Sequence, residues 1–239
     1  HLCLGQGSQA QSHFNHAIQL ADSLGNQRGK GRALHRLGLS HLLFGEFNEA
    51  TRLHQQALVI AQGGGYQPDE ANYNGHLAVC HYYADNTAEA IKHFTTAIQQ
   101  CRDSGHHTSE GLFTGLFGEL LSEMGRLNEA KIRLTEARSL LHNGHPSISN
   151  YFASVLAWVQ IRLYERTEAL ALFEQPHPVN GTYVLPHIKM LCHKAKVYHL
   201  AQHLDQAKQA LAQAKQLFER LHLKHTCLPS SDIQATDLL

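Results

Sequence analysis

Residues 45–57 read Gly-Glu-Phe-Asn-Glu-Ala-Thr-Arg-Leu-His-Gln-Gln-Ala, and residues 125–137 read Gly-Arg-Leu-Asn-Glu-Ala-Lys-Ile-Arg-Leu-Thr-Glu-Ala. Related triplets that end in alanine recur along the whole chain at intervals of 38 to 40 residues. These alanines are Ala10, Ala50, Ala90, Ala130, Ala169 and Ala207. A near-constant period of this length indicates an array of repeated structural units.

Each unit contains the pattern of two helices. Four residues after the first alanine stands a larger residue, as at His54 and Phe94, and seven residues after it stands a second small residue. These second small residues are Ala17, Ala57, Ala97, Ala137 and Ala214. Such spacings place the side chains on one helical face. A large-small pair such as Leu37-Gly38 lies twelve or thirteen residues upstream of the first alanine, and a glycine such as Gly45 suits the turn between them. We therefore expect a helix, a tight turn and a second helix in each unit.

The large-small pair, the turns Gly45–Ala50 and Gly125–Ala130 and the alanines that follow them resemble the tetratricopeptide repeat. The resemblance covers residues 5 to about 221. It departs from the pattern where Asp85 replaces a turn glycine, where Pro176 shortens a second helix, and where Lys194 takes a large apolar position. The period is longer than the usual 34 residues. In this it is similar to the extended repeats in C-terminal regions of large bacterial signalling ATPases, kinases and regulators, and in cell-polarity scaffolds.

The resemblance implies an all-α, right-handed α-solenoid of five helix pairs preceded by half a pair. We expect the superhelical domain to span residues 1–223 and a C-terminal tail to span 224–239. The expected units are about 1–26, 27–66, 67–106, 107–146, 147–183 and 184–223. Because the first unit has no first helix, we expect the native protein to continue N-terminal to His1 with more repeats or a catalytic domain.

In tetratricopeptide arrays the first helix of each pair lines a concave face that holds extended peptides or helices. Positions on that face follow from the register of the large-small pairs. The predicted peptide-binding residues are Arg32, His35, Arg36, Leu39, Asn72, His76, Val79, Tyr82, Tyr83, Glu119, Glu123, Trp158, Arg162, Lys189, His193 and Lys196. Aromatic residues of this kind anchor many interfaces. The face is expected to bind a protein or peptide ligand, with the protein's own N-terminal domains as a further candidate.

One subclass of ligand is disfavoured by the residues on this face. Tetratricopeptide co-chaperones hold a C-terminal Glu-Glu-Val-Asp peptide with Lys, Asn, Asn, Lys and Arg on three consecutive first helices. The corresponding positions here are His35, Leu39, His76, Leu112 and Leu116. We therefore do not expect this chain to bind chaperone tails.

Composition narrows the function further. Twenty basic residues balance twenty acidic ones, which argues against a nucleic-acid binder or a membrane-surface protein. The sequence contains no stretch of about 18 apolar residues and no nucleophile or phosphate-loop motif. Five cysteines without a CxxC pair are typical of reduced cytoplasmic thiols. We expect a cytoplasmic binding protein that is not an enzyme and has no cofactor.

Three hypotheses remain open at this point. The first is a peptide-binding scaffold, and the second is an intramolecular sensory or regulatory arm of a multidomain ATPase, kinase or transcription regulator. The third, disfavoured, is a metal-binding protein that uses some of the 20 histidines. His199 and His203 have i,i+4 spacing, but no metal-binding motif surrounds them.

Overall fold

The computed structural model describes residues 7–174 and 184–220, and all regular secondary structure within these ranges is α-helical. The predicted tail 224–239 and Pro176 lie outside the described residues. The helices are α1 (Gly7–Ser23), α2 (Gln27–Leu43), α3 (Phe47–Gly64), α4 (Gln67–Tyr83), α5 (Thr87–Asp103), α6 (His107–Glu123), α7 (Leu127–Leu141), α8 (Pro146–Arg162), α9 (Arg166–Ala171), α10 (Val184–Leu200) and α11 (Leu204–Arg220).

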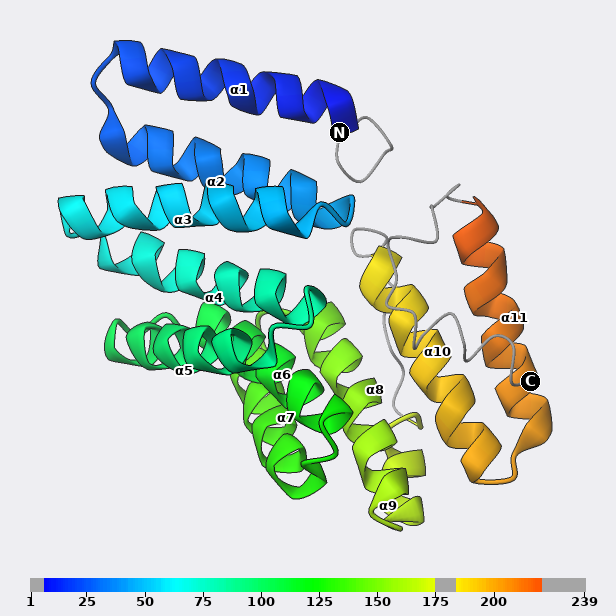
Figure 1. Ribbon diagram of the computed structural model, residues 1–239. Coiled ribbons are helices and arrows are strands. Elements are labelled where there is room, and N and C mark those ends of the chain that lie inside the picture. Colours follow the sequence, from blue (N-terminus) through cyan, green and yellow to red (C-terminus); the bar gives the residue numbers. More distant parts are fainter. Residues whose placement is uncertain (1–6, 175–183, 221–239) are drawn as a thin grey trace. The chain divides into compact units, whose positions relative to one another are not determined.

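Consecutive helices form hairpins, as Figure 1 shows for α2 with α3, α4 with α5 and α10 with α11. A single helix, α1, precedes the first hairpin and packs against α2. The described residues thus form five pairs and a leading half pair, which confirms the α-solenoid class of fold. The chain divides into two compact units, with the boundary between Glu110 and Gly111 inside α6.

The turn inside each pair depends on one residue in the left-handed region. Gly45 and Gly125 have φ values of 75° and 78°, which confirms their predicted role. Asp85 takes the same place in the second pair with φ 59°, and Tyr164 and Gln202 take it in the last two pairs. The residue that follows donates its backbone N–H to the carbonyl of the residue five positions earlier. Asn86 N to His81 O, for example, is 2.9 Å.

The repeated alanines lie where helices approach one another. Ala50, Ala90, Ala130, Ala169 and Ala207 are all fully buried. The second alanines Ala57, Ala97, Ala137 and Ala214 are buried as well. Ala17 differs, because it is exposed on α1, which has no first helix beside it among the described residues.

Two departures from the repeat pattern have visible structural consequences. Helix α9 contains only six residues, in agreement with the expectation that the second helix of the fifth repeat unit, residues 147–183, is short. Lys194 is half-buried at the position that is a large apolar residue in other repeats. Its ammonium lies 5.5 Å from the centre of the Phe173 ring and 5.6 Å from that of the Tyr198 ring. Burial lowers the pKa of Lys194.

Replacing a packing alanine tests this arrangement. Ala90→Leu adds volume at a fully buried contact of α5 and should lower the free energy of unfolding by about 1–3 kcal/mol. The matched control is Ala88→Leu at an exposed position of the same helix, which should change it by less than about 0.5 kcal/mol. Urea unfolding followed by circular dichroism measures both. Equal effects of the two substitutions would contradict the assigned packing.

Candidate functional site

A buried polar row crosses the first helices of the third, fourth and fifth pairs, within the C-terminal compact unit. Glu119 lies on α6, Tyr151 on α8 and Lys189 on α10. The Tyr151 hydroxyl donates to Glu119 Oε1 at 2.6 Å, and Lys189 Nζ is 3.5 Å from the same oxygen. The Glu119 and Lys189 side chains are only 6% and 11% exposed. One carboxylate therefore ties the three helices together across the face that α6, α8 and α10 form, which we call the first-helix face.

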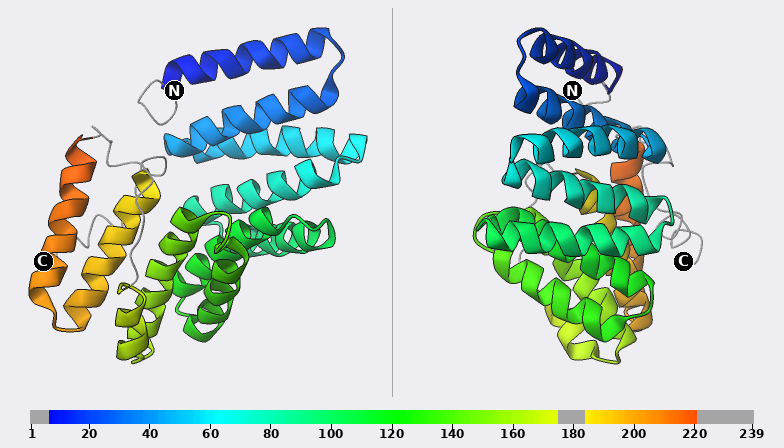
Figure 2. Two further views of the ribbon diagram at one scale, coloured as in Figure 1. Left: turned by 180° about the vertical axis from the view of Figure 1, so that it is seen from behind. Right: turned by 60° about the vertical axis from the view of Figure 1, so that its left-hand side comes forward.

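Close packing of the helices supports this row. A Cβ added to Gly115 on α6 would lie 2.2 Å from Phe152 Cε2 on α8, so only glycine permits this approach. Helix α10 packs beside α8, as the left view of Figure 2 also shows. One turn along from the row, Ser154 Oγ lies 3.4 Å from His193 Nδ1 and donates to the Tyr151 carbonyl at 2.6 Å. Both side chains are buried.

A more accessible cluster lies near the C-terminal end of α8. Trp158 is half-buried, and two cations lie within 6 Å of the centre of its rings. The Arg162 Cζ is 5.7 Å away, and the Lys196 Nζ on α10 is 5.8 Å away. Arg162 Nη1 donates to the Ser122 carbonyl on α6 at 3.0 Å. We call Trp158, Arg162 and Lys196 the tryptophan cluster.

In the N-terminal compact unit, three histidines from α2, α3 and α4 pack around one another. We call them the histidine trio. The ring centroids of His35 and His54 are 5.0 Å apart, and those of His35 and His76 are 4.8 Å apart. His35 Nδ1 lies 3.3 Å from His54 Nδ1, and Asn72 Nδ2 lies 3.4 Å from His35 Nε2. If Asn72 donates to His35, then His35 donates to His54, and the remaining His54 proton is on Nε2. His54 Nε2 is buried without a hydrogen-bond partner.

Burial holds these histidines neutral. It lowers the pKa of His54 to about 3 and that of His76 to about 4, and the pKa of His35 falls well below its usual value. The neighbouring imidazoles add to the effect on His35 and His54. The histidine trio therefore fills the core rather than providing charge at neutral pH.

The cationic end of the predicted face in the first unit is paired with an acid. Arg28 Nε lies 2.7 Å from Asp69 Oδ2, and Arg32 Nη2 lies 3.2 Å from Asp69 Oδ1. Asp69 is on α4 and both arginines are on α2, so this bridge links two first helices. Hydrogen bonding to Asp69 is the main reason that the pKa of Arg28 is raised.

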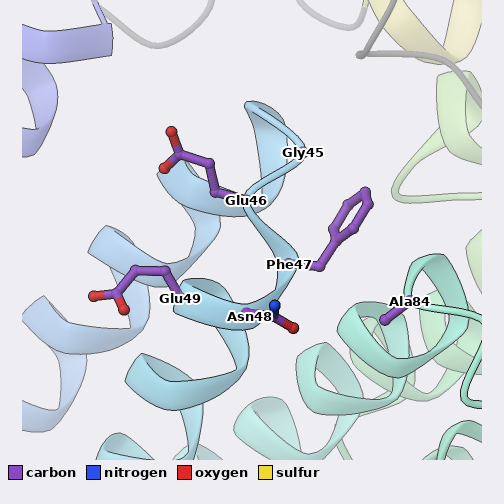
Figure 3. A pocket seen from close by; sticks show the side chains of 6 residues that line it. All are labelled: Gly45, Glu46, Phe47, Asn48, Glu49 and Ala84. Atoms are coloured by element: carbon purple, nitrogen blue, oxygen red, sulfur yellow. The ribbon is translucent and has the colours of Figure 1, made fainter.

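Aromatic rings lie side by side at the other end of α4. Tyr82 stacks on Tyr83 with centroids 4.9 Å apart, and Tyr83 stacks on Phe47 at 5.6 Å. A pocket of about 360 Å³ adjoins Phe47, lined also by Gly45, Glu46, Asn48, Glu49 and Ala84. Figure 3 shows the Phe47 side chain on the side of Ala84, whereas the Glu46 and Glu49 carboxylates extend to the opposite side. The pocket therefore has an apolar wall at the α2–α3 turn, and sequence reasoning did not identify it.

The predicted peptide-binding residues fall into three groups by exposure. Arg32, Arg36 and Glu123 are exposed. Leu39, Asn72, His76, Tyr83, Trp158, Arg162 and Lys196 are half-buried. His35, Val79, Tyr82, Glu119, Lys189 and His193 are buried. The buried group packs between the helices, and only the exposed and half-buried groups are accessible at the surface.

Sequence reasoning missed the partners that fix these residues. Asp69 was not among the predicted site residues, although it bonds to side chains about one repeat away. Arg28 and Asp69 are 41 residues apart in sequence, and Arg162 and Ser122 are 40 apart. Complementary polar groups at one repeat length were thus the available signal.

Neither a cluster of candidate metal ligands nor a helix that could span a membrane occurs in the described ranges. Residues 7–174 and 184–220 contain no group of three His, Cys, Asp or Glu side chains arranged to hold a metal ion. Among the helices in those ranges, none combines the length and apolar character that crossing a membrane requires.

Comparison with known proteins identifies the family. The family model described as Tetratricopeptide repeat matches residues 1–63 and 69–141, which is more than half of the chain. This chain belongs to the tetratricopeptide repeat family, and its repeats indicate a protein-interaction scaffold. No curated protein matches it. Its fold is similar to that of BtubC (BKLC) from P. vanneervenii, with a TM-score of 0.66 and 13% identity over 92% of this chain and 94% of that chain.

The histidine trio predicts that acid lowers the folding stability of the N-terminal compact unit. The pKa values are lowered in the folded state, so the unfolded chain binds more protons as pH falls through 6.5, and stability decreases toward pH 4 to 3. Each buried histidine should account for a loss of about 2 kcal/mol between pH 8 and pH 5. Leu134 occupies the position of His54 two repeats later, where it contacts Gly118 as His54 contacts Gly38. His54→Leu should therefore reduce the loss of stability between pH 8 and pH 5 by the contribution of one histidine.

Urea unfolding at the two pH values measures the difference. The control is Phe94→Leu, at the equivalent position one repeat later, which lowers stability at both pH values without changing the pH dependence. A His54→Leu variant with the full acid sensitivity of the parent would contradict the neutral, buried state of His54.

The buried row predicts a second, non-additive effect. Lys189→Met leaves the Glu119 carboxylate buried without its cation and should lower the free energy of unfolding by about 3 kcal/mol. Adding Glu119→Gln should restore most of that loss, because the amide keeps the acceptor for Tyr151 and carries no charge. The control is Lys131→Met, which breaks a more exposed pair with Glu165 and should cost about 1 kcal/mol or less. Additive effects of the two row substitutions would argue against the coupling.

Proposed function

We propose that this chain is a non-catalytic scaffold that binds an extended segment of a partner protein on its first-helix face. The observation that supports the proposal is the tryptophan cluster. It combines a half-buried indole with two cations, on a face whose helices are held in place by buried polar rows. Aromatic and arginine side chains on a preorganised surface are typical of binding sites.

The position of the residues within the repeats also supports binding on this face. Glu119, Tyr151 and Lys189 come from three successive first helices, and Ser122, Trp158 and Lys196 repeat the arrangement further along the same helices. An extended ligand that crosses these three helices would contact one repeat after another.

A regulatory role within a larger polypeptide is the second candidate function. The extended repeat length, similar to that of bacterial signalling proteins, favours it. The same face would then bind a segment of the same polypeptide, and the chemistry of recognition would not change. We also propose a cytoplasmic location, supported by the free, buried thiols of Cys80 and Cys101.

Selection of binders from a displayed library of random peptides tests the binding function. Trp158→Ala should weaken the selected peptides at least about tenfold, because the indole offers the apolar contact of the cluster. Circular dichroism and the unfolding midpoint establish that the variant remains folded, and Trp158→Phe should retain part of the affinity.

The matched control is Ile132→Ala, which removes an exposed apolar side chain from α7 in the same unit. Peptides that bind the Trp158→Ala variant as tightly as the parent, or that lose affinity through Ile132→Ala instead, would place the binding surface elsewhere.

A further inference from the structure

Arg162 is held in a fixed orientation by two contacts. Its Nη1 donates to the Ser122 carbonyl at 3.0 Å, and the guanidinium carbon lies 5.7 Å from the centre of the Trp158 rings. The first contact fixes one edge of the guanidinium, and the second restrains its plane. An arginine anchored in this way loses less conformational entropy when it binds a ligand.

The opposite edge of Arg162 has no partner among the described residues. No carboxylate in the described ranges pairs with this side chain, and its Nε and Nη2 groups make no hydrogen bond there. Two other arginines show what this edge can hold, since Arg52 and Arg126 each use Nε and Nη2 together to bind the carboxylate of a nearby glutamate. The same two-donor edge, which matches the two oxygens of a carboxylate, is open on Arg162.

Lys196 adds a second positive charge at the same aromatic group. Its ammonium reaches the Trp158 rings from α10, whereas Arg162 reaches them from the end of α8. The buried rows fix the helices that carry these residues, so the two cations do not have to be brought together when a ligand arrives. Two cations beside a half-buried indole favour a group that is both negatively charged and adjacent to an apolar surface.

We propose that the tryptophan cluster is a subsite for an acidic side chain, Asp or Glu, of an extended peptide, with Arg162 receiving the carboxylate as a two-donor fork. Lys196 provides longer-range attraction, and Trp158 contacts an apolar side chain next to the acid. This inference rests on the proposed function and adds the chemical class of its ligand. The residues differ from the chaperone-tail clamp, whose positions carry other side chains in this chain.

An array of peptide pairs that differ only in the residue at the central position tests the subsite. The probes are twelve-residue peptides with amidated C-termini, which carry Asp or Glu in one set and Asn or Gln in the other. The chain contains one tryptophan, so tryptophan fluorescence reports on Trp158 alone. Acidic peptides should bind at least about tenfold more tightly than their amide counterparts, and Arg162→Gln should remove this difference.

Arg162→Lys distinguishes the fork from simple charge. Lysine keeps the positive charge but offers no planar pair of donors, so most of the preference for the acidic peptides should be lost. Lys196→Gln should reduce the preference less. The control is Arg133→Gln, which removes an arginine that also lies over an aromatic ring, Phe117, but is already paired with Glu136. It should leave peptide binding unchanged.

The outcomes separate this inference from the proposed function. If peptides bind and Trp158→Ala weakens them, but acidic and amide peptides bind equally, the subsite is overturned and the binding face stands. If no peptide of the array changes the fluorescence of Trp158, both are overturned. If phosphoserine peptides bind more than about tenfold better than acidic ones through Arg162, the ligand class is phosphopeptide and the carboxylate assignment is wrong.

Discussion

The close approach of helices at alanine is the constraint on which the rest of the structure depends. Ala50, Ala90 and Ala130 have no exposed surface, and the neighbouring helix leaves no room for a longer side chain. A pair of helices with small residues at these points can bury the apolar stripe of the next pair, which no single pair could do alone. The face that carries the tryptophan cluster exists because this contact recurs.

Polar contacts then set the register of one repeat against the next. They join residues about one repeat apart in sequence, such as Ser154 with His193 at a separation of 39 and Arg28 with Asp69 at 41. Because apolar stripes are tolerant of small shifts, a directional bond at each step restricts the sliding of helices. The buried carboxylate of Glu119 restricts the sliding of three helices, because Tyr151 and Lys189 both contact it. Loss of Lys189 would leave its charge buried without a cation.

Periodicity was sufficient to predict the helix pairs, the turn glycines and the family, because each depends on the size of residues at fixed spacing. The same reasoning identified Trp158, Arg162 and Lys196 as members of one face. It could not separate residues that a ligand can reach from those that fill the space between helices. His35 is a polar residue at a face position, yet it is buried against His54, and that depends on the sizes of side chains in neighbouring repeats. The pairing of Arg32 with Asp69 likewise required the structure.

The left-handed turn residues show that the architecture of the pairs does not require glycine at the turn. The family model stops at residue 141, and beyond it the turns inside the pairs use Tyr164 and Gln202 in place of glycine. Each such residue carries a strain on the order of 1 kcal/mol, and Tyr164 directs its ring almost wholly into solvent. The turn therefore has the same left-handed backbone geometry with and without glycine, and a motif search that requires glycine would miss these two repeats. Glycine at these two positions would relieve the strain, because it has no Cβ to clash in the left-handed region.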